Sequence, residues 1–316
     1  MRRSNFDAQM QRPSVTAFGV FDGLHLGHQA LIEHVVRLAS QVGGAASIVT
    51  FDPHPAQVLS PTSAPELIGT LEQRLEGLEI LGVDQVGVLS FDEFAARESA
   101  AAFVERVLVG YLGTTDLVVG DDVHFGRGRE GDIALLAREG ERHGFRVHTS
   151  PTYGGASRFS STEVRARLGE GDVRGAREIL GRPFVLRAPV AHGDARGRDL
   201  GFPTANLRGA PRQKLPATGI YAAAVRWGRG EWRCGAVSVG TRPQFYEEGD
   251  LLVEVHLPGF DGDLYDVVLD VAFLERLRGE AVFDTLADLV TQMTLDVQRC
   301  EEIFEKFTPG AWVLLG

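Results

Sequence analysis

The chain has 316 residues, enough for about two domains, and its 44% hydrophobic and 24% charged residues are typical of a soluble globular protein. A net charge of −11 argues against broad nucleic-acid binding, which needs a basic face, but allows a local pocket for a small anion. Residues 1–14 are polar, and no apolar run could span a bilayer, so we expect no signal peptide, anchor or membrane partner. The two cysteines, Cys234 and Cys300, fit a reducing, cytoplasmic setting.

The first half of the chain alternates apolar runs with amphipathic segments. Helices are predicted after residue 28 and over 73–81, 99–111 and 133–144, between strands at 15–18, 45–50, 85–89, 116–119 and 146–149. Continuous apolar strands separated by amphipathic helices indicate a parallel sheet covered on both faces, a Rossmann-like α/β domain. Ligands of such sheets bind at the carboxyl ends of the strands.

The second half has a different pattern. Short helices are predicted from 161 to about 168 and over 173–180, and Pro183 stops the second one, so we place the boundary between domains 1–182 and 183–316. Short β-rich runs separated by turn residues then indicate an antiparallel β-barrel, with strands at 185–191, 220–227, 231–239, 251–257 and 265–273. A final helix from Thr285 to about Lys306 is expected to cover or plug the barrel.

The most informative motif is the turn Gly19-Val20-Phe21-Asp22-Gly23-Leu24-His25-Leu26-Gly27-His28, between the first strand and its helix. Backbone amides at a helix start favour anions, and the imidazoles of His25 and His28 can donate to phosphate oxygens. Two other interpretations stay open. The histidines satisfy hydrogen bonds within the turn, or they ligate zinc, although no clear third ligand follows.

A second motif, Phe159-Ser160-Ser161-Thr162-Glu163-Val164-Arg165, offers hydroxyls and amides at another helix start, with Arg165 within reach of a phosphate. Alone it could be only a helix cap. The run 126–131 matches G-x-G-x-x-G but is too charged and follows no strand directly, and no P-loop motif occurs. The two motifs together therefore predict a site for nucleotide phosphates.

These motifs resemble those of the nucleotidyltransferase superfamily and, more narrowly, of the bacterial bifunctional riboflavin kinases/FMN adenylyltransferases. The resemblance covers nearly the whole chain and continues at 50–55, 119–126, 192–206, 254–257 and 260–265. It implies that the first domain converts FMN to FAD with ATP and that the riboflavin-kinase-like barrel phosphorylates riboflavin. It also implies ATP, riboflavin and FMN as substrates, Mg²⁺ as the metal, and a monomer or weak homo-oligomer.

In the first domain the resemblance implies that His25 and His28 act on the triphosphate of ATP. The other residues implied to bind ATP are Gly19, Phe21, Asp22, Gly23, Asp122, Ser161, Thr162 and Arg165. The residues implied to line the flavin are Phe51, Pro53, His54 and Phe125, for which ordinary packing at the end of the sheet is the alternative.

In the barrel, strand alternation puts Glu254 and His256 on one face, so Glu254 is a candidate base for the riboflavin hydroxyl, unless it faces solvent. The resemblance implies that Thr204 and Asn206 hold the metal and that Arg278 and Glu280 form a flap over the flavin. The residues implied to bind the kinase nucleotide are Gly193, Arg196, Gly201, Phe202, Pro203, Thr204 and Asn206.

Three barrel positions depart from the family pattern: Ser238 replaces an asparagine, Gln244 a threonine and Asp266 a glycine. We expect altered affinity or flavin preference from these changes rather than loss of activity. One alternative is that only the adenylyltransferase half is active. Another is a non-catalytic sensor of flavin or nucleotide on the same scaffold.

Overall fold

The computed structural model describes residues 1–5, 10, 12–150, 159–192, 201–207, 212–241 and 251–311. The chain forms two compact units, the first made of Met1–Pro65 and Leu71–Ser160 and the second of Glu66–Thr70 and Ser161–Gly316. A search of the described residues finds no helix with the length and apolar character that a membrane crossing requires.

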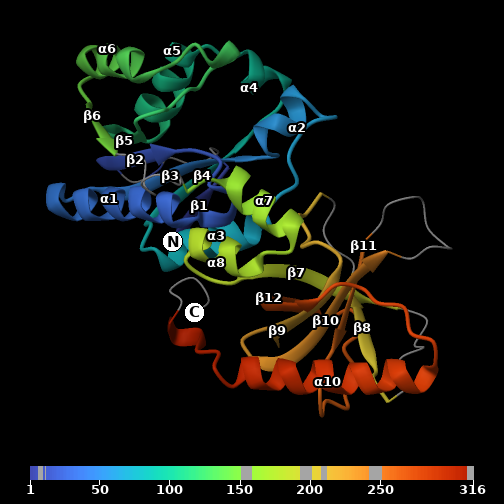
Figure 1. Cartoon of the computed structure of the whole chain (residues 1–316). Coiled ribbons are helices and arrows are strands. Elements are labelled where there is room, and N and C mark those ends of the chain that lie inside the picture. The colour runs from blue at the N-terminus through green and yellow to red at the C-terminus, as the bar shows by residue number, and fades with distance from the viewer. Residues whose placement is uncertain are drawn as a thin grey trace. The chain divides into compact units, whose positions relative to one another are not determined.

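The first unit is built on a six-stranded parallel sheet of order β1-β4-β3-β2-β5-β6 (Figure 1). This confirms the predicted α/β architecture; only β1 was not predicted, because it is short and polar. The strands are β1 Arg2–Ser4, β2 Ser14–Phe18, β3 Ala45–Asp52, β4 Gln85–Ser90, β5 Thr114–Gly120 and β6 Arg146–Ser150.

Helices connect these strands: η1 Asp22–Leu24, α1 Leu26–Val42, α2 Pro55–Leu59, α3 Leu71–Ile80, α4 Glu93–Arg97, α5 Ala100–Phe103, η2 Val104–Tyr111, η3 Arg127–Arg129 and α6 Ile133–His143. The predicted helix over 99–111 is present as α5 followed by the π-helical η2. Its apolar residues pack into a core with Leu117 and Leu136, so the sheet is a rigid support for the loops at its carboxyl edge.

The second unit is a closed antiparallel barrel of order β10-β11-β8-β7-β12-β9, with β9 also paired to β10 (Figure 1). The predicted barrel is confirmed. Its strands are β7 Phe184–Ala191, β8 Thr204–Leu207, β9 Gly219–Trp227, β10 Arg233–Thr241, β11 Leu251–His256 and β12 Val268–Arg278. Its helices are α7 Ser161–Glu170, α8 Val173–Leu180, α10 Leu286–Phe304 and the short η4 Pro309–Ala311.

Two helical elements pack on the barrel. The C-terminal helix α10 contacts β9, β10 and β12, in keeping with its predicted covering role, and α8 contacts β7 and β12. One face of α8 is buried, through Val173, Ala176, Ile179 and Leu180. The helices α7 and α8 thus belong to the second compact unit, while the predicted boundary at residues 182 and 183 concerns the two activities and stays a prediction.

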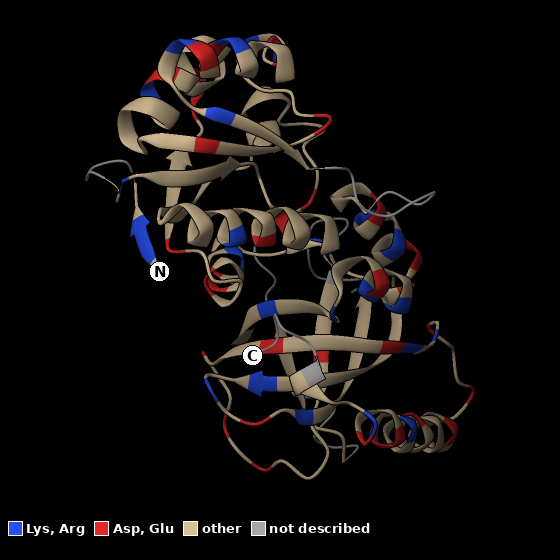
Figure 2. Cartoon of the chain, turned by 90° about the vertical axis from the view of Figure 1, so that its left-hand side faces the viewer, with Lys and Arg blue, Asp and Glu red and all other residues tan. Residues whose placement is uncertain are grey.

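Charged side chains of both signs are interspersed along the helices. In the view of Figure 2, Lys and Arg are interspersed with Asp and Glu along the longer helices. Since the net charge of the chain is −11, an anion must be bound by a local arrangement of charges.

Candidate active sites

A strained turn positions the two histidines of the first unit. Between β2 and α1, Phe21, Gly23 and Leu24 have φ angles of 53°, 77° and 44°. Only glycine adopts this left-handed region freely, so Phe21 and Leu24 are held there by their burial. Such strain is typical of functional turns. The turn ends at His25, which is the N-cap of α1.

His25 has one ring nitrogen committed to the fold. Its Nδ1 accepts a hydrogen bond from the backbone N–H of His28 at 3.3 Å. In the neutral ring the proton therefore resides on Nε2, which makes Nε2 the donor. The turn interpretation thus accounts for one nitrogen of His25, and the other has the protonation that a phosphate oxygen requires.

His28 is in a different environment, although its ring stacks on that of His25 with centroids 3.6 Å apart. Burial, followed by the charges of His25 and Arg74, lowers the pKa of His28 well below its usual value. Its Nδ1 is buried and has no hydrogen-bond partner among the described residues. An unsatisfied buried nitrogen is costly, so its position favours a ligand-binding role over a packing role. A bound anion would raise this pKa again.

Arg74 is a functional candidate that the sequence analysis missed. Its guanidinium is buried beneath the carboxyl end of β3, where Nη1 donates to Thr50 Oγ1 at 3.0 Å and to Phe51 O at 2.9 Å. Thr50 Oγ1 in turn donates to Val20 O in the histidine turn at 3.0 Å. Burial lowers the pKa of Arg74, while Asp22 and Asp52 oppose that shift. The available signal was its place on the apolar stripe of α3, beside Leu75 and Leu78.

The residues predicted for the flavin side of the first unit make packing and capping contacts. His54 caps α2, its Nδ1 accepting from Ala56 N at 3.1 Å. Phe51 lies edge-on to Phe91, and Phe125 lies edge-on to Phe18 and Phe103 with centroids 5.1 and 5.7 Å apart. Pro53 follows β3 directly, and Asp122 is exposed after β5. Flavin contact by these side chains stays a prediction.

Ser161, Thr162 and Arg165 lie in the first turns of α7, which belongs to the second unit. The Nε of Arg165 donates to Glu66 O at 2.6 Å. That these three residues share one triphosphate with His25 and His28 stays a prediction. The zinc interpretation of the two histidines gains no support, since the described residues contain no cluster of three or more His, Cys, Asp or Glu side chains.

The barrel unit contains a cavity of about 290 Å³ between its strands and α10, with Glu254, His256, Thr204, Ser238, Arg278 and Glu280 in its lining. Glu254 therefore faces a cavity shared with Thr204 rather than open solvent. Leu289, Met293 and Val297 of α10 form an apolar wall. Acidic, hydroxyl and apolar groups thus line one cavity, as is common in small-molecule sites.

Strand register explains this convergence. Glu254 on β11 pairs with Asn206 on β8 and with Ser238 on β10, and His256 pairs with Thr204. Directly paired residues share a face of the sheet. The Oδ1 of Asn206 is buried and has no hydrogen-bond partner among the described residues. A hydroxyl and an amide oxygen beside a carboxylate are the ligands that a hard cation such as Mg²⁺ prefers.

A second cavity, of about 380 Å³, is lined by Pro203, Thr204, Phe260, Asp263 and Tyr265. Thr204 borders both cavities. Phe202 lies edge-on to His256, whose Nδ1 is 2.9 Å from Pro203 O, and Gly201 makes the preceding turn with a φ of 80°. The predicted nucleotide residues Gly193 and Arg196, and the departure at Gln244, lie outside the described residues.

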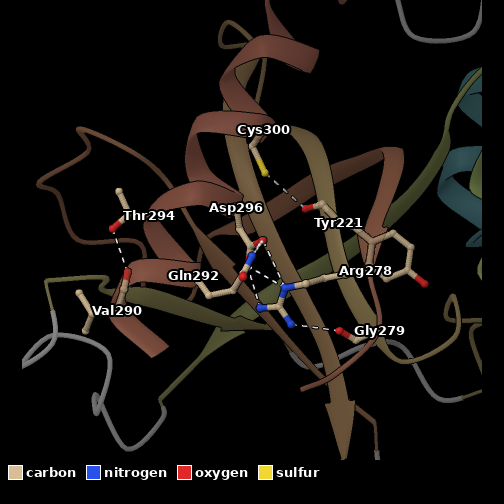
Figure 3. Close-up of polar contacts among 8 residues, drawn as sticks. All are labelled: Tyr221, Arg278, Gly279, Val290, Gln292, Thr294, Asp296 and Cys300. Atoms are coloured by element: carbon tan, nitrogen blue, oxygen red, sulfur yellow. Dashed lines mark hydrogen bonds and ion pairs between the residues drawn. The ribbon is translucent and has the colours of Figure 1, made fainter. Parts of the chain in front are cut away.

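Arg278 and Glu280, the predicted flap residues, lie where β12 leaves the barrel. Arg278 is held by a carboxylate of α10, Asp296, which the sequence analysis did not identify (Figure 3). An added Cβ at Gly240 would lie 2.7 Å from Glu280 Oε1, so this carboxylate rests against the end of β10. Arg278 is thus tied to α10 and Glu280 lies near β10, and both line the cavity that contains Glu254. Their role as a flap over the flavin stays a prediction.

Comparison with known proteins agrees with both halves. A model described as FAD synthetase matches residues 7–163, and one described as riboflavin kinase matches 180–304. The bifunctional riboflavin kinase/FMN adenylyltransferase of Pseudomonas fluorescens is 40% identical over 288 residues, which cover 90% of this chain and 91% of that protein. That of Escherichia coli K12 is 36% identical over 308 residues, 97% of each. The chain belongs to the bifunctional riboflavin kinase/FMN adenylyltransferase family.

Family membership confirms the resemblance inferred from the motifs and the order of the two enzymatic domains. A crystal structure described as a macrolide-efflux protein from Streptococcus pneumoniae is also similar, with a TM-score of 0.84 and 27% identity over 98% of this chain and 100% of that one. The FAD synthetase and riboflavin kinase models leave residues 164–179 between them, which hold most of α7 and all but the last residue of α8.

Proposed function

We propose that the barrel unit transfers the γ-phosphate of ATP to the 5′-hydroxyl of riboflavin and that the parallel-sheet unit transfers the adenylyl group of ATP to the resulting FMN. The observation that carries the kinase assignment is the pairing of Glu254 with Asn206 beside a cavity that Thr204 shares. The adenylyltransferase assignment rests on the strained turn that presents His25 and His28.

In the kinase reaction, Glu254 accepts the proton of the riboflavin hydroxyl as that oxygen bonds to the γ-phosphorus. The bond from the γ-phosphorus to the bridging oxygen breaks, and ADP leaves. Thr204 Oγ1 and Asn206 Oδ1 would hold Mg²⁺, which neutralises phosphate charge when bound. The unsatisfied Oδ1 of Asn206 supports this assignment.

The two barrel cavities suit the two kinase substrates. The cavity of about 290 Å³ has an apolar wall from α10 and contains Glu254, so we assign it to riboflavin. The cavity of about 380 Å³ is lined by Pro203 and Phe260, and we assign it to ATP. Transfer then takes place at Thr204, which borders both.

In the adenylyltransferase reaction, a phosphate oxygen of FMN attacks the α-phosphorus of ATP and pyrophosphate leaves. The backbone amides at the start of α1 and the Nε2–H of His25 stabilise the charge that develops on the phosphate. His28 adds a second ring, and Arg74 supplies a buried positive charge nearby. Ser161, Thr162 and Arg165 would bind the β- and γ-phosphates.

Separate substitutions test the division of labour. His28→Ala should lower FAD formation from FMN by roughly 100-fold or more, because it removes a group beside the reacting phosphates, and should spare FMN formation. Glu254→Gln should do the reverse by a similar factor, because an amide cannot accept the proton. Purified protein is incubated with ATP, Mg²⁺ and either flavin, and the products are resolved by chromatography.

Each alternative has its own outcome in that assay. Conversion of FMN to FAD without any phosphorylation of riboflavin would mean that only the adenylyltransferase half is active. Flavin binding without turnover of either substrate would indicate a sensor. Loss of both activities in one folded single variant would contradict the assignment of one reaction to each unit.

We also propose that the protein works in the cytoplasm as a monomer or weak homo-oligomer. Two free thiols support a reducing compartment, and burial raises the pKa of Cys234 and of Cys300 to about 12, which makes both poor nucleophiles.

A further inference from the structure

A partly buried ion pair joins the last strand of the barrel to its covering helix. Asp296 of α10 is only 7% exposed, and it accepts from Nη2 of Arg278 at 2.7 Å and from Nε at 3.1 and 3.2 Å (Figure 3). Gln292, one turn earlier, donates to Asp296 Oδ1 at 2.9 Å. Both oxygens of the Asp296 carboxylate thus accept from the Arg278 guanidinium, and Oδ1 also accepts from Gln292.

The guanidinium of Arg278 has more N–H donors than its contacts with Asp296 use. Its Nη1 donates to Gly279 O at 3.0 Å, so these hydrogen bonds use Nε–H and one N–H on each terminal nitrogen. One N–H on Nη1 and one on Nη2 have no hydrogen-bond partner among the described residues. Arg278 and Asp296 both line the cavity that contains Glu254. The orientation that Asp296 imposes therefore decides where these donors point.

Stability alone does not explain the pair. Of the residues of α10, Asp296 and Cys300 are buried, whereas Leu286 is 61% exposed. A buried ion pair contributes little or nothing compared with well-packed apolar side chains of similar size. The pair lies in the wall of the cavity that contains Glu254. This location suits a carboxylate whose role is to hold the N–H donors of Arg278 in one place.

We infer that Asp296 is a positioning residue of the riboflavin site, which fixes Arg278 so that its two remaining N–H groups address the polar, carbonyl-bearing edge of the flavin ring. This inference rests on the proposed kinase function and on the assignment of the cavity of about 290 Å³ to riboflavin. Gln292 helps to fix the Asp296 carboxylate through its hydrogen bond to Oδ1.

The test is steady-state kinetics of the full-length chain carrying Asp296→Asn, which keeps the size of the side chain but removes its charge. The KM for riboflavin should rise about tenfold or more, because the donors lose their fixed direction, while kcat changes less than threefold. The KM for ATP and the rate of FAD formation from FMN should stay at the wild-type values. Glu301→Gln, an exposed acid on the same helix, is the matched control and should change none of these quantities.

A double-mutant cycle separates positioning from packing. If Asp296 acts through Arg278, Asp296→Asn should add less than twofold to the riboflavin KM of an Arg278→Met variant. Independent, multiplying effects would overturn the inference. So would a lowered melting temperature of Asp296→Asn with an unchanged riboflavin KM, since that is the result of a purely structural role.

Gln292→Met keeps the proposal testable if Asp296→Asn does not fold. It removes only the neutral bond to Oδ1 and should raise the riboflavin KM about two- to threefold, and an unchanged KM would count against the inference. Absence of riboflavin phosphorylation by the wild type would instead refute the proposed kinase function. The two failures are therefore distinguishable.

Discussion

At the scale of single residues, neighbouring side chains of one type do different work. His25 and His28 stack, yet His25 caps α1 through Nδ1 whereas the Nδ1 of His28 is buried without a partner among the described residues.

The departure at Asp266 from the family pattern is explained by its backbone conformation. Its φ of 62° lies in the region where glycine is most at ease and aspartate is tolerated, so the usual glycine can be replaced without changing the turn.

The lowered pKa of His28 predicts a pH dependence of stability. Below the ordinary value of 6.5 the unfolded chain binds a proton at this ring more readily than the folded chain does. The free energy of unfolding should therefore fall as the pH drops below about 6.5, until the lowered pKa is reached. His28→Gln lacks this titration, so it should lose less stability than the wild type between pH 8 and pH 5.5.

Hydrogen exchange of peptides from α1 measures this difference within the first unit. Near pH 8 the His28 ring is neutral in the folded and the unfolded state. The difference in protection between the wild type and His28→Gln should therefore not vary with small changes of pH. Equal losses of protection in both proteins on acidification would show that His28 does not contribute.

At the scale of elements, periodicity predicted which segments form but not all of their contacts. The alternation of β11 correctly placed Glu254 and His256 on one face. The helix predicted from Thr285 does line the cavity, through Leu289 and Met293. Its buried residue Asp296 was not predicted, because a lone acid in a helix is usually exposed. Strand β8 was not predicted as a strand, since its four residues are too few to show alternation.

The start of α10 should contribute measurably to barrel stability. Thr285 caps this helix, its Oγ1 accepting from Asp288 N at 3.1 Å and lying 2.6 Å from Asp288 Oδ2. Thr285→Ala should lower the free energy of unfolding of the barrel unit by about 1 kcal/mol. The control is Thr291→Ala. Thr291 is also exposed on α10, and its hydroxyl donates only to Ala287 O within the helix, so this substitution should leave the free energy of unfolding nearly unchanged.

Tryptophan fluorescence follows this unfolding selectively. The three tryptophans of the chain, Trp227, Trp232 and Trp312, all lie in the sequence of the second unit, so urea titration reports that unit. Equal destabilisation by the two threonine substitutions would mean that the cap has no special part in holding α10.

At the scale of the whole molecule, the two compact units do not divide the chain where the helix-breaking proline lies. Helices α7 and α8 precede Pro183 but belong with the barrel, and α8 buries Val173, Ile179 and Leu180. Residues 66–70 also belong there: Leu67 bridges to Gln213, and Lys214 pairs with Glu66 at 2.7 Å. A helix-stop signal therefore marks the end of an element without marking the end of a compact unit.

Truncation tests which residues the barrel needs. A fragment 161–316 should be more stable than a fragment 183–316 by several kcal/mol, because each buried Val, Ile or Leu side chain of α8 contributes about 1.5–3 kcal/mol. Urea unfolding of both fragments, read by tryptophan fluorescence, gives the difference. Equal midpoints would show that the barrel is complete without α7 and α8, and would favour the boundary after residue 182.

Local chemistry in the sequence was enough to establish the α/β unit, the barrel and the family, because apolar periodicity, turn residues and the phosphate-binding motifs act over a few neighbouring positions. Only the tertiary structure showed that Arg74 lies buried beneath the histidine turn. It also showed that Asn206, Glu254 and Ser238 pair across three neighbouring strands and that Asp296 binds Arg278. These groups are brought together by strand register and helix packing, which depend on residues far apart in the chain. No pattern within a short window carries that information.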